Sequence, residues 1–546
     1  LESFWQEPEL PFPNADEEVW WEVWLARSTD NADDPIEGIR NRLQDAHIQI
    51  GDSFLKFPEH CVYLLRGTVE QLGSTILYTD KLAELRQPKD TAEFFSYLDI
   101  QEQNEWINNL NGRIDQHTST VSVCLLDTGV NRNNPLLENL IPPRHLDSVR
   151  PDWTTADTHP QGHGTPMAGL ILYGDLTEAL ASTARIQLYH QLESIKLLHY
   201  AAPHDPMLYG AVTQEAVARG EIINPHHKRI ICMAITCEHL DKGRPSSWSS
   251  AIDQTIYGSA EVPNSKLLFF ISAGNTYSEE WINYPLANDE SSIQDPAQSF
   301  NAITVGAYSL KDQIDFNRHP GATLLAPRGA IGSCSKTSVS WDNEWCRKPD
   351  VVMEGGNKAL LNGDVIEADS LQLLTTSKGG IGRSHLTLFS DTSASTALAA
   401  KFSAELYHHY PNLWPETIRG LIIHSADWTT AMLGGRTINH LPLDEKIKLI
   451  SRVGYGVPNM QRARFSANNS LSLIAERTLK PFKKEKSKIK TNEFHLFDLP
   501  WPRNILQELP IGTLVSLKVT LSYFIEPNPG NQKYDLAASY RSCGLR

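Results

Sequence analysis

The sequence has no apolar run long enough to cross a membrane and no excess of basic residues. A transmembrane helix needs about 20 consecutive, mostly apolar residues, and no such run occurs. The 546 residues include 49 Lys and Arg against 65 Asp and Glu, which gives a formal net charge of −16. An acidic surface repels the phosphates of nucleic acids. The composition therefore predicts a globular protein with neither a membrane nor a nucleic-acid partner.

Cysteine is scarce, and its spacing is irregular. The chain holds seven cysteines, an odd number scattered along its length. Disulfide-rich secreted domains carry an even number at short spacings, whereas Cys124 and Cys232 lie in apolar runs where a thiol acts as a small hydrophobic side chain. The pattern favours a reducing compartment, and we expect a cytoplasmic location. No signal peptide is visible; because the chain starts at Leu1 and stops without a closing element, we also expect it to be a piece of a longer protein.

Residues 1–112 form the first of three predicted domains. Alternating apolar residues predict strands, and amphipathic stretches predict helices. The expected order is strand 20–25, helix 36–46, strands 47–57 and 60–66, helix 68–77 and strand 82–85. This β-α-β-β-α-β order is typical of a ferredoxin-like, split βαβ domain. The sequence therefore predicts an N-terminal α+β domain.

Residues 113–465 carry the signature of a larger α/β domain. Nearly continuous apolar runs predict strands at 121–126, 230–235, 267–271 and 302–307, and helical patterns separate them. Strands without polar alternation are typical of a parallel sheet covered on both faces. Small apolar residues over 394–410 predict a buried helix, and Pro415 marks the start of another over 415–425. We expect a doubly wound, mostly parallel sheet.

Residues 466–546 differ again in composition. Lysines recur between 480 and 490, which we interpret as a solvated edge or linker on this acidic chain. Apolar residues alternate over 514–523 and predict a strand. The sequence therefore predicts a C-terminal, β-sandwich-like region.

An acid and a base are indicated by two short motifs of the second domain. Asp127 ends an apolar strand, where a rigid backbone can aim a carboxylate at an imidazole. His163 lies between two glycines and opens a helix of small residues, which favours a general base over a structural histidine. The Asp-Thr-Gly that begins at Asp127 also occurs in aspartic proteases. That alternative needs a second copy or a dimer partner, and no second copy is found.

An oxyanion donor and a nucleophile are indicated by two further motifs. Asn275 follows an apolar strand and Gly274, so it supplies an uncharged donor with little freedom. Ser393 precedes a long helical pattern, where the helix dipole and its own N–H favour an oxyanion. Each residue alone could be a turn or capping residue. Their coincidence at strand and helix ends predicts a serine hydrolase.

With these motifs the chain resembles the subtilisin-like serine peptidases, the subtilases, whose acid, base and nucleophile follow in the order Asp, His, Ser. The resemblance covers residues 113–465 and implies that Ser393 attacks a peptide carbonyl, His163 moves the proton, Asp127 orients His163, and Asn275 binds the oxyanion. It also implies that substrate pairs as an added strand with two edge segments. These segments are Ala234, Ile235 and Thr236 on one side and Ser272, Ala273 and Gly274 on the other.

Several positions depart from the family pattern. Asp391 stands where the family usually has Gly before Thr-Ser, and Ala397 stands where it usually has Pro. The extra carboxylate of Asp391, beside the nucleophile, motivates an alternative: a catalytically impaired subtilase fold that binds peptides. The resemblance further implies a propeptide-like role for the N-terminal domain, either removed or retained as a regulatory domain. The resemblance implies that no cofactor is required. It also implies structural calcium, at positions that cannot be matched to residues, and an AAA-type ATPase partner as in some bacterial relatives.

Overall fold

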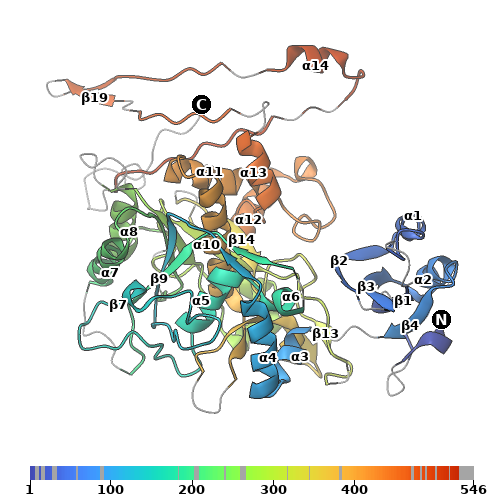
Figure 1. Cartoon of the computed structure of the whole chain (residues 1–546). Helices are drawn as coiled ribbons and strands as arrows, with labels where there is room; N and C mark the ends of the chain where they lie inside the picture. Colours follow the sequence, from blue (N-terminus) through green and yellow to red (C-terminus); the bar gives the residue numbers. More distant parts are fainter. Residues whose placement is uncertain are drawn as a thin grey trace. The chain divides into compact units, whose positions relative to one another are not determined.

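The computed structural model forms two compact units, Leu1–Phe94 with Leu180–Ala184, and Phe95–Ala179 with Arg185–Arg546 (Figure 1). The structure describes residues 1–6, 12–13, 19–27, 34–56, 59–86, 91–181, 184–201, 208–238, 242–258, 266–316, 318–342, 345–379, 384–468, 473–479, 482–485, 488–498, 501–513, 515 and 517–527. The predicted domain limits at 112 and 465 stay predictions.

The first unit is a four-stranded antiparallel sheet in the order β2-β3-β1-β4. Its elements are β1 (Val19–Ala26), α1 (Arg40–Asp45), β2 (Gln49–Lys56), β3 (His60–Gly67), α2 (Val69–Ile76) and β4 (Leu82–Arg86). This confirms the predicted element order. The first helix begins at Arg40 rather than near Ile36, because residues 35–39 form turns and the Ile36 amide donates to Asp34 Oδ1 at 3.2 Å.

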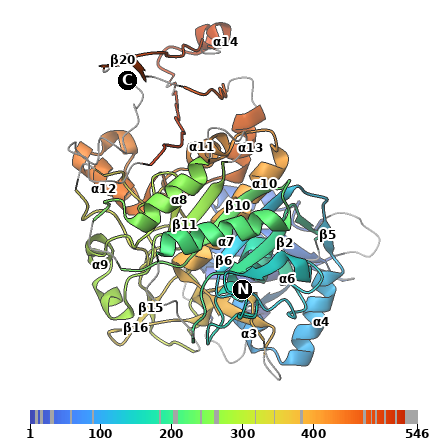
Figure 2. The same cartoon turned by 90° about the vertical axis from the view of Figure 1, so that its left-hand side faces the viewer.

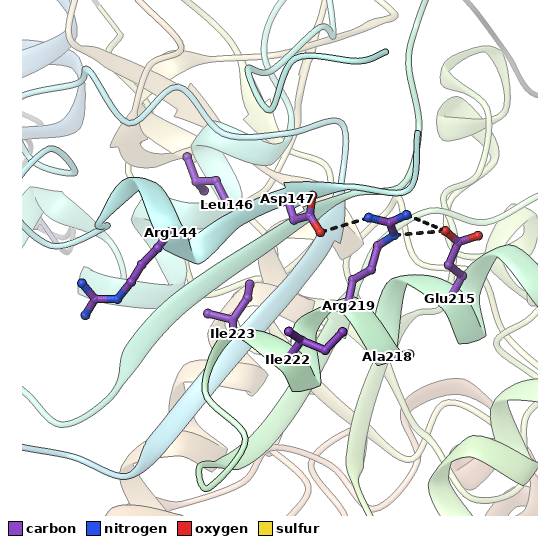
Figure 3. Close-up of a pocket in the computed structure, with 8 residues that line it drawn as sticks. All are labelled: Arg144, Leu146, Asp147, Glu215, Ala218, Arg219, Ile222 and Ile223. Carbon is purple, nitrogen blue, oxygen red and sulfur yellow. Dashed lines mark hydrogen bonds and ion pairs between the residues drawn. The ribbon is translucent and has the colours of Figure 1, made fainter. Parts of the chain in front are cut away.

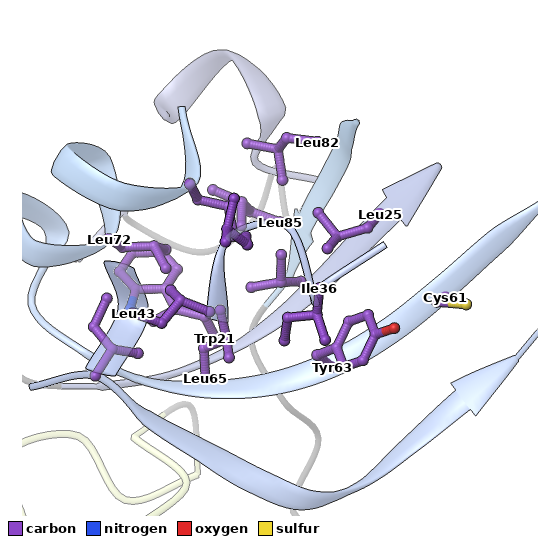
Figure 4. Packing of buried hydrophobic residues seen from close by; sticks show 14 residues of the cluster. Trp21, Leu25, Ile36, Leu43, Cys61, Tyr63, Leu65, Leu72, Leu82 and Leu85 are labelled. Carbon is purple, nitrogen blue, oxygen red and sulfur yellow. The ribbon is translucent and has the colours of Figure 1, made fainter. Parts of the chain in front are cut away.

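A compact apolar core holds the first unit together. Trp21, Val23 and Leu25 alternate along β1 and are fully buried, as the two-residue period of a strand requires. Leu43 of α1 and Leu72 of α2 complete the same cluster (Figure 4). The sequence pattern thus places one face of the sheet against both helices.

The second unit contains the predicted parallel sheet, with seven strands in the order β14-β12-β11-β10-β6-β9-β7. The strands are β6 (Val121–Asp127), β7 (Leu146–Ser148), β9 (Gln191–Lys196), β10 (Lys228–Met233), β11 (Leu268–Ser272), β12 (Ile303–Tyr308) and β14 (Val351–Glu354). Every residue of β6, β11 and β12 is buried, which explains their lack of polar alternation.

Helices pack around the sheet. Helices α5 (Gly164–Tyr173) and α10 (Asp391–His409) contact each other and the central strands. Helices α7 (Tyr209–Ile223) and α8 (Ser247–Tyr257) lie side by side across the face nearer the viewer in Figure 2. Helix α11 spans Pro415–Ser425, as predicted. Among the described residues, no helix combines the length and the apolar character that crossing a membrane requires.

The chain has further helices and strands. They are η1 (Glu2–Phe4), α3 (Thr91–Tyr97), α4 (Ile100–Asn111), β5 (Ile114–Gln116), η2 (Pro143–His145), α6 (Leu176–Ala181), β8 (Ile186–Leu188), η3 (Ser278–Asn283), α9 (Leu286–Glu290), β13 (Thr323–Leu324), β15 (Ala359–Leu361), β16 (Asp364–Ile366), η4 (Asp369–Leu371), β17 (Leu373–Thr376), β18 (Leu386–Phe389), η5 (Ile438–His440), α12 (Leu443–Val453), α13 (Met460–Asn468), β19 (Phe482–Glu485), β20 (Lys488–Thr491) and α14 (Arg503–Glu508).

The predicted strand over 514–523 is wrong for the residues that the structure describes there, which form no strand. A strand needs a hydrogen-bonding neighbour, and this segment instead uses side chains: Lys518 Nζ donates to the Ala426 carbonyl at 3.0 Å, and Thr520 contacts His424 Nδ1 at 2.8 Å. After α13, the described residues hold only the β19–β20 hairpin and α14 as regular elements. They do not form the expected β-sandwich.

Candidate active site

Asp127 lies at the carboxyl end of β6 and is fully buried. Its carboxylate accepts hydrogen bonds from the Thr128 amide at 2.7 Å and from His163 Nδ1 at 2.8 Å. Burial alone would raise the pKa of Asp127, but the charge of His163 and these hydrogen bonds outweigh burial and lower the pKa below 3.8. Asp127 is therefore ionised and holds the imidazole in one orientation.

His163 directly precedes α5, and its ring connects the acid to the nucleophile. Its Nε2 lies 3.1 Å from Ser393 Oγ, while Nδ1 faces Asp127. The close approach needs the following glycine, because a Cβ on Gly164 would lie 2.1 Å from the Gly129 carbonyl oxygen. Burial alone would lower the pKa of His163, but the charge of Asp127 and the hydrogen bond to it raise the pKa above 6.5.

Asp157 is a buried carboxylate that sequence reasoning missed. Its Oδ2 accepts the backbone N–H groups of His163 at 3.0 Å and Thr165 at 2.9 Å, and its Oδ1 accepts the Thr128 hydroxyl at 2.8 Å. It thereby fixes the backbone of the base and the turn after the acid. No local motif marks a lone loop aspartate; its role depends on contacts that only the folded chain supplies.

Ser393 lies in the first turn of α10 and is 6% exposed. The helix N-terminus favours negative charge at this point. Asp391 opens the helix with a φ of 69°, a left-handed conformation that suits the glycine expected there. Its carboxylate lies 3.2 Å from Nζ of the buried Lys358, so the extra negative charge beside the nucleophile is paired.

Asn275 follows β11 by three residues and faces the start of α10. Its Oδ1 accepts a hydrogen bond from the Thr392 hydroxyl at 2.5 Å and a longer one from the Thr392 amide at 3.2 Å. The Thr392 hydroxyl in turn lies 2.8 Å from Ser272 Oγ. Since the amide is planar and its oxygen is engaged, the NH₂ group is the part that remains to donate.

The two predicted substrate segments lie on either side of Gln294. Ala234, Ile235 and Thr236 follow β10 and are partly exposed, whereas Ser272, Ala273 and Gly274 are buried. The Ala273 carbonyl accepts from the Gln294 amide at 3.2 Å, and a Cβ on Gly274 would lie 2.2 Å from Gln294 Oε1. Gln294, which the sequence analysis did not single out, thus closes the space between the segments.

A surface depression of about 660 Å³ lies elsewhere, between β7 and α7 (Figure 3). Arg219 pairs across it with Asp147 of β7 and along α7 with Glu215. None of the candidate catalytic residues lines it. Among the described residues, no group of three or more His, Cys, Asp or Glu side chains is arranged to hold a metal ion.

A comparison with models of known protein families agrees with this geometry. Residues 118–456 match the model of the subtilase family, Peptidase_S8. Similar solved structures include the epidermin leader peptide processing serine protease of Staphylococcus aureus, at 14% identity and a TM-score of 0.41 over 83% of this chain and 99% of that one. A lanthipeptide protease follows at 15% identity and a TM-score of 0.41 over 64% and 88%. No curated protein matches the sequence.

Proposed function

The chain belongs to the subtilase family of serine peptidases, and we propose that Asp127, His163 and Ser393 are its catalytic triad and that it is an endopeptidase acting on proteins or peptides. The observation that carries the proposal is the continuous hydrogen-bonded path from Asp127 through His163 Nδ1 and Nε2 to Ser393 Oγ, with contacts of 2.8 Å and 3.1 Å. These groups come from three distant parts of the chain, and such a path is what nucleophilic catalysis requires.

The chemistry follows from these positions. Ser393 Oγ attacks the scissile carbonyl while His163 Nε2 takes its proton, and the ionised Asp127 stabilises the imidazolium that forms. The Asn275 NH₂ group and the Ser393 N–H donate to the oxyanion of the tetrahedral intermediate. His163 then gives the proton to the leaving amine, and water, activated by the same imidazole, releases the acyl group from Ser393.

The substrate is expected to lie along Ala234–Thr236 and Ser272–Gly274 as an added strand. Ser272, Ala273 and Gly274 are buried, and the backbone groups of Ala273 and Gly274 already bond within the fold. Ala234–Thr236 is partly exposed and is therefore the more accessible of the two segments. Backbone recognition tolerates many sequences, so side-chain pockets beside the two segments must set the cleavage preference.

For the N-terminal unit we propose a propeptide-like role. The support is its βαββαβ order and antiparallel sheet, which match the sequence-based expectation. N-terminal sequencing of concentrated wild-type protein beside Ser393→Ala tests the role. Cleavage between residues 105 and 118 in the wild type alone supports removal by the enzyme itself, and an intact chain in both supports a retained regulatory domain.

A bacterial, cytoplasmic setting also remains a proposal. The cytoplasmic location is supported by the cysteines that the structure describes, all of which are free thiols, including the exposed Cys237 and Cys346. The expected AAA-type ATPase partner and the absence of a required cofactor stay predictions.

Hydrolysis of a protein substrate by three variants tests the proposed function. Ser393→Ala should lower kcat by roughly 10⁶-fold, and Asp127→Asn by roughly 10⁴-fold because the imidazole loses its orientation. Activity that survives Ser393→Ala but disappears in Asp127→Asn supports the aspartic protease alternative instead. A folded wild type without activity supports the impaired, peptide-binding alternative. Glu279→Gln, on the exposed surface, serves as the matched control.

A further inference from the structure

A group of polar side chains, here called the Glu238 cluster, lies between the two proposed substrate segments. Its members are Thr236, Glu238, Tyr277, Gln294 and Lys336. The Thr236 hydroxyl donates to Gln294 Oε1 at 2.5 Å, and Gln294 Nε2 donates to Glu238 Oε1 at 2.8 Å. The chain of bonds therefore starts on one substrate segment, and the Gln294 backbone ties it to the other.

The Glu238 cluster lies next to the oxyanion donor. Lys336 N donates to the Gly274 carbonyl at 3.2 Å, and the Gln294 side chain occupies the space beside Gly274, the residue before Asn275. A carbonyl held by the Asn275 amide belongs to the substrate residue on the acyl side of the scissile bond, P1. The side chain of that residue branches from the carbon next to this carbonyl, so we expect it to extend toward the side of Asn275 on which Gln294 and Glu238 lie.

The charges of the cluster are arranged asymmetrically. Lys336 Nζ donates to Glu238 Oε1 at 2.6 Å, yet the lysine side chain is only 4% exposed and the glutamate side chain 49%. The Tyr277 hydroxyl donates to the same oxygen at 3.2 Å, so three donors converge on Oε1. Within the part of the chain that the structure describes, Oε2 accepts no hydrogen bond. The ammonium is therefore buried, whereas half of the glutamate side chain is exposed and its Oε2 has spare acceptor capacity.

The ionisation of Glu238 agrees with this arrangement. Burial alone would raise the pKa of Glu238, but the hydrogen bonds from Lys336 and Gln294 outweigh burial and lower the pKa. The carboxylate therefore keeps its charge at neutral pH, and its fixed position limits the entropy lost when it binds a second cation.

Building on the proposed peptidase function, we propose that Glu238 selects the substrate by binding the guanidinium of Arg or the ammonium of Lys at P1 through Oε2. Both side chains are long and carry only donors, which match the free acceptor. An acidic P1 side chain would instead face the Glu238 carboxylate and be rejected. The enzyme would thus cleave after basic residues.

Four peptides that differ only at P1, with Arg, Lys, Gln or Glu, test the proposal. The wild type should show a kcat/KM about 10- to 100-fold higher for Arg and Lys than for Gln, the usual effect of a hydrogen bond to a charged group, and the lowest value for Glu. Glu238→Gln should reduce the Arg-to-Gln ratio by about the same factor. Glu279→Gln, which removes an equal charge from the neighbouring η3, should leave the ratio unchanged.

Covalent labelling of Ser393 by a small fluorophosphonate, which has no P1 side chain, distinguishes failure of the Glu238 proposal from failure of the proposed peptidase function. Labelling of Ser393 in both the wild type and Glu238→Gln shows that the peptidase function stands. If the wild type then cleaves the Gln or Glu peptide best, or if Glu238→Gln keeps the preference for basic residues, the role of Glu238 is overturned. If the wild type is not labelled and cleaves none of the peptides, the proposed function fails and this proposal fails with it.

Discussion

Lys358 Nζ lies 3.2 Å from Asp391 Oδ1, and this ion pair brings a buried ammonium to the start of the nucleophile helix. The lysine side chain is 2% exposed and also pairs with Glu367, and its ammonium lies 4.5 Å from the centre of the Trp281 ring. Asp391 holds a left-handed backbone conformation two residues before Ser393. The ion pair thus balances the charge of Asp391 and holds this residue in a conformation that glycine would adopt more easily.

Lys358→Met should leave the Asp391 carboxylate without its main partner. Because Asp391 is 24% exposed, water screens part of the loss, and we expect the free energy of unfolding to fall by about 1–3 kcal/mol. Asp391→Gly removes the carboxylate and suits the positive φ, so it should cost less than about 1 kcal/mol. Urea unfolding measures both. A double variant less stable than Lys358→Met alone contradicts the pairing.

The pH profile should report His163. The imidazole must be neutral to accept the Ser393 proton, and its pKa lies above 6.5. We therefore expect kcat/KM to rise with pH and to reach half its maximum above 6.5. In Asp127→Asn the carboxylate that raises the pKa of His163 is absent, so burial lowers this pKa. The residual activity should therefore reach half its maximum at lower pH. Identical pH midpoints in the two proteins would contradict the claim that Asp127 raises the pKa of His163.

The same pKa shift affects stability. The folded state binds a proton at His163 more tightly than the unfolded chain does, so its contribution to stability is complete below pH 6.5 and is lost as pH rises through the folded pKa. Urea unfolding should therefore show a stabilising contribution at acidic pH that is absent from His163→Gln. An equal pH dependence in both proteins contradicts the shift.

Thr392 should act as a positioning residue for the oxyanion donor. Thr392→Val keeps the side-chain shape but removes the hydroxyl that donates to Asn275 Oδ1. We expect kcat to fall about 10-fold with KM nearly unchanged, less than the roughly 10²–10³ that loss of an oxyanion donor costs. Thr392→Ser keeps the hydroxyl and should retain most of kcat. A change confined to KM would place Thr392 in substrate binding instead.

Asp157→Asn should damage the base without touching substrate. The new NH₂ group would face either the His163 and Thr165 amides or the Thr128 hydroxyl and the His159 amide, all of which donate to the carboxylate. Leaving buried donors unpaired costs about 1–3 kcal/mol of stability. Thermal unfolding measures this loss, and Asp152→Asn, on the exposed surface, is the control. Equal melting temperatures would contradict the role.

The sequence alone singled out the candidate site residues that are marked by their immediate neighbours in the chain. Asp127 and Asn275 were identifiable because Asp127 ends and Asn275 follows a buried strand of a parallel sheet, and the carboxyl ends of such strands meet at one edge. Asp157, Lys358 and Gln294 were not, because each acts through partners far away in the chain. The strand expected over 514–523 failed for a related reason: alternation predicts an exposed and a covered face, but it does not supply a neighbouring strand.

Intact-mass spectrometry after incubation with a fluorophosphonate tests the central claim most directly. The wild type should gain one covalent adduct that maps to Ser393, and Ser393→Ala should gain none, because only an alcohol deprotonated by His163 reacts readily with the probe. A folded wild type that remains unmodified, or an adduct that persists in Ser393→Ala, would contradict the assignment of Asp127, His163 and Ser393 as a catalytic triad.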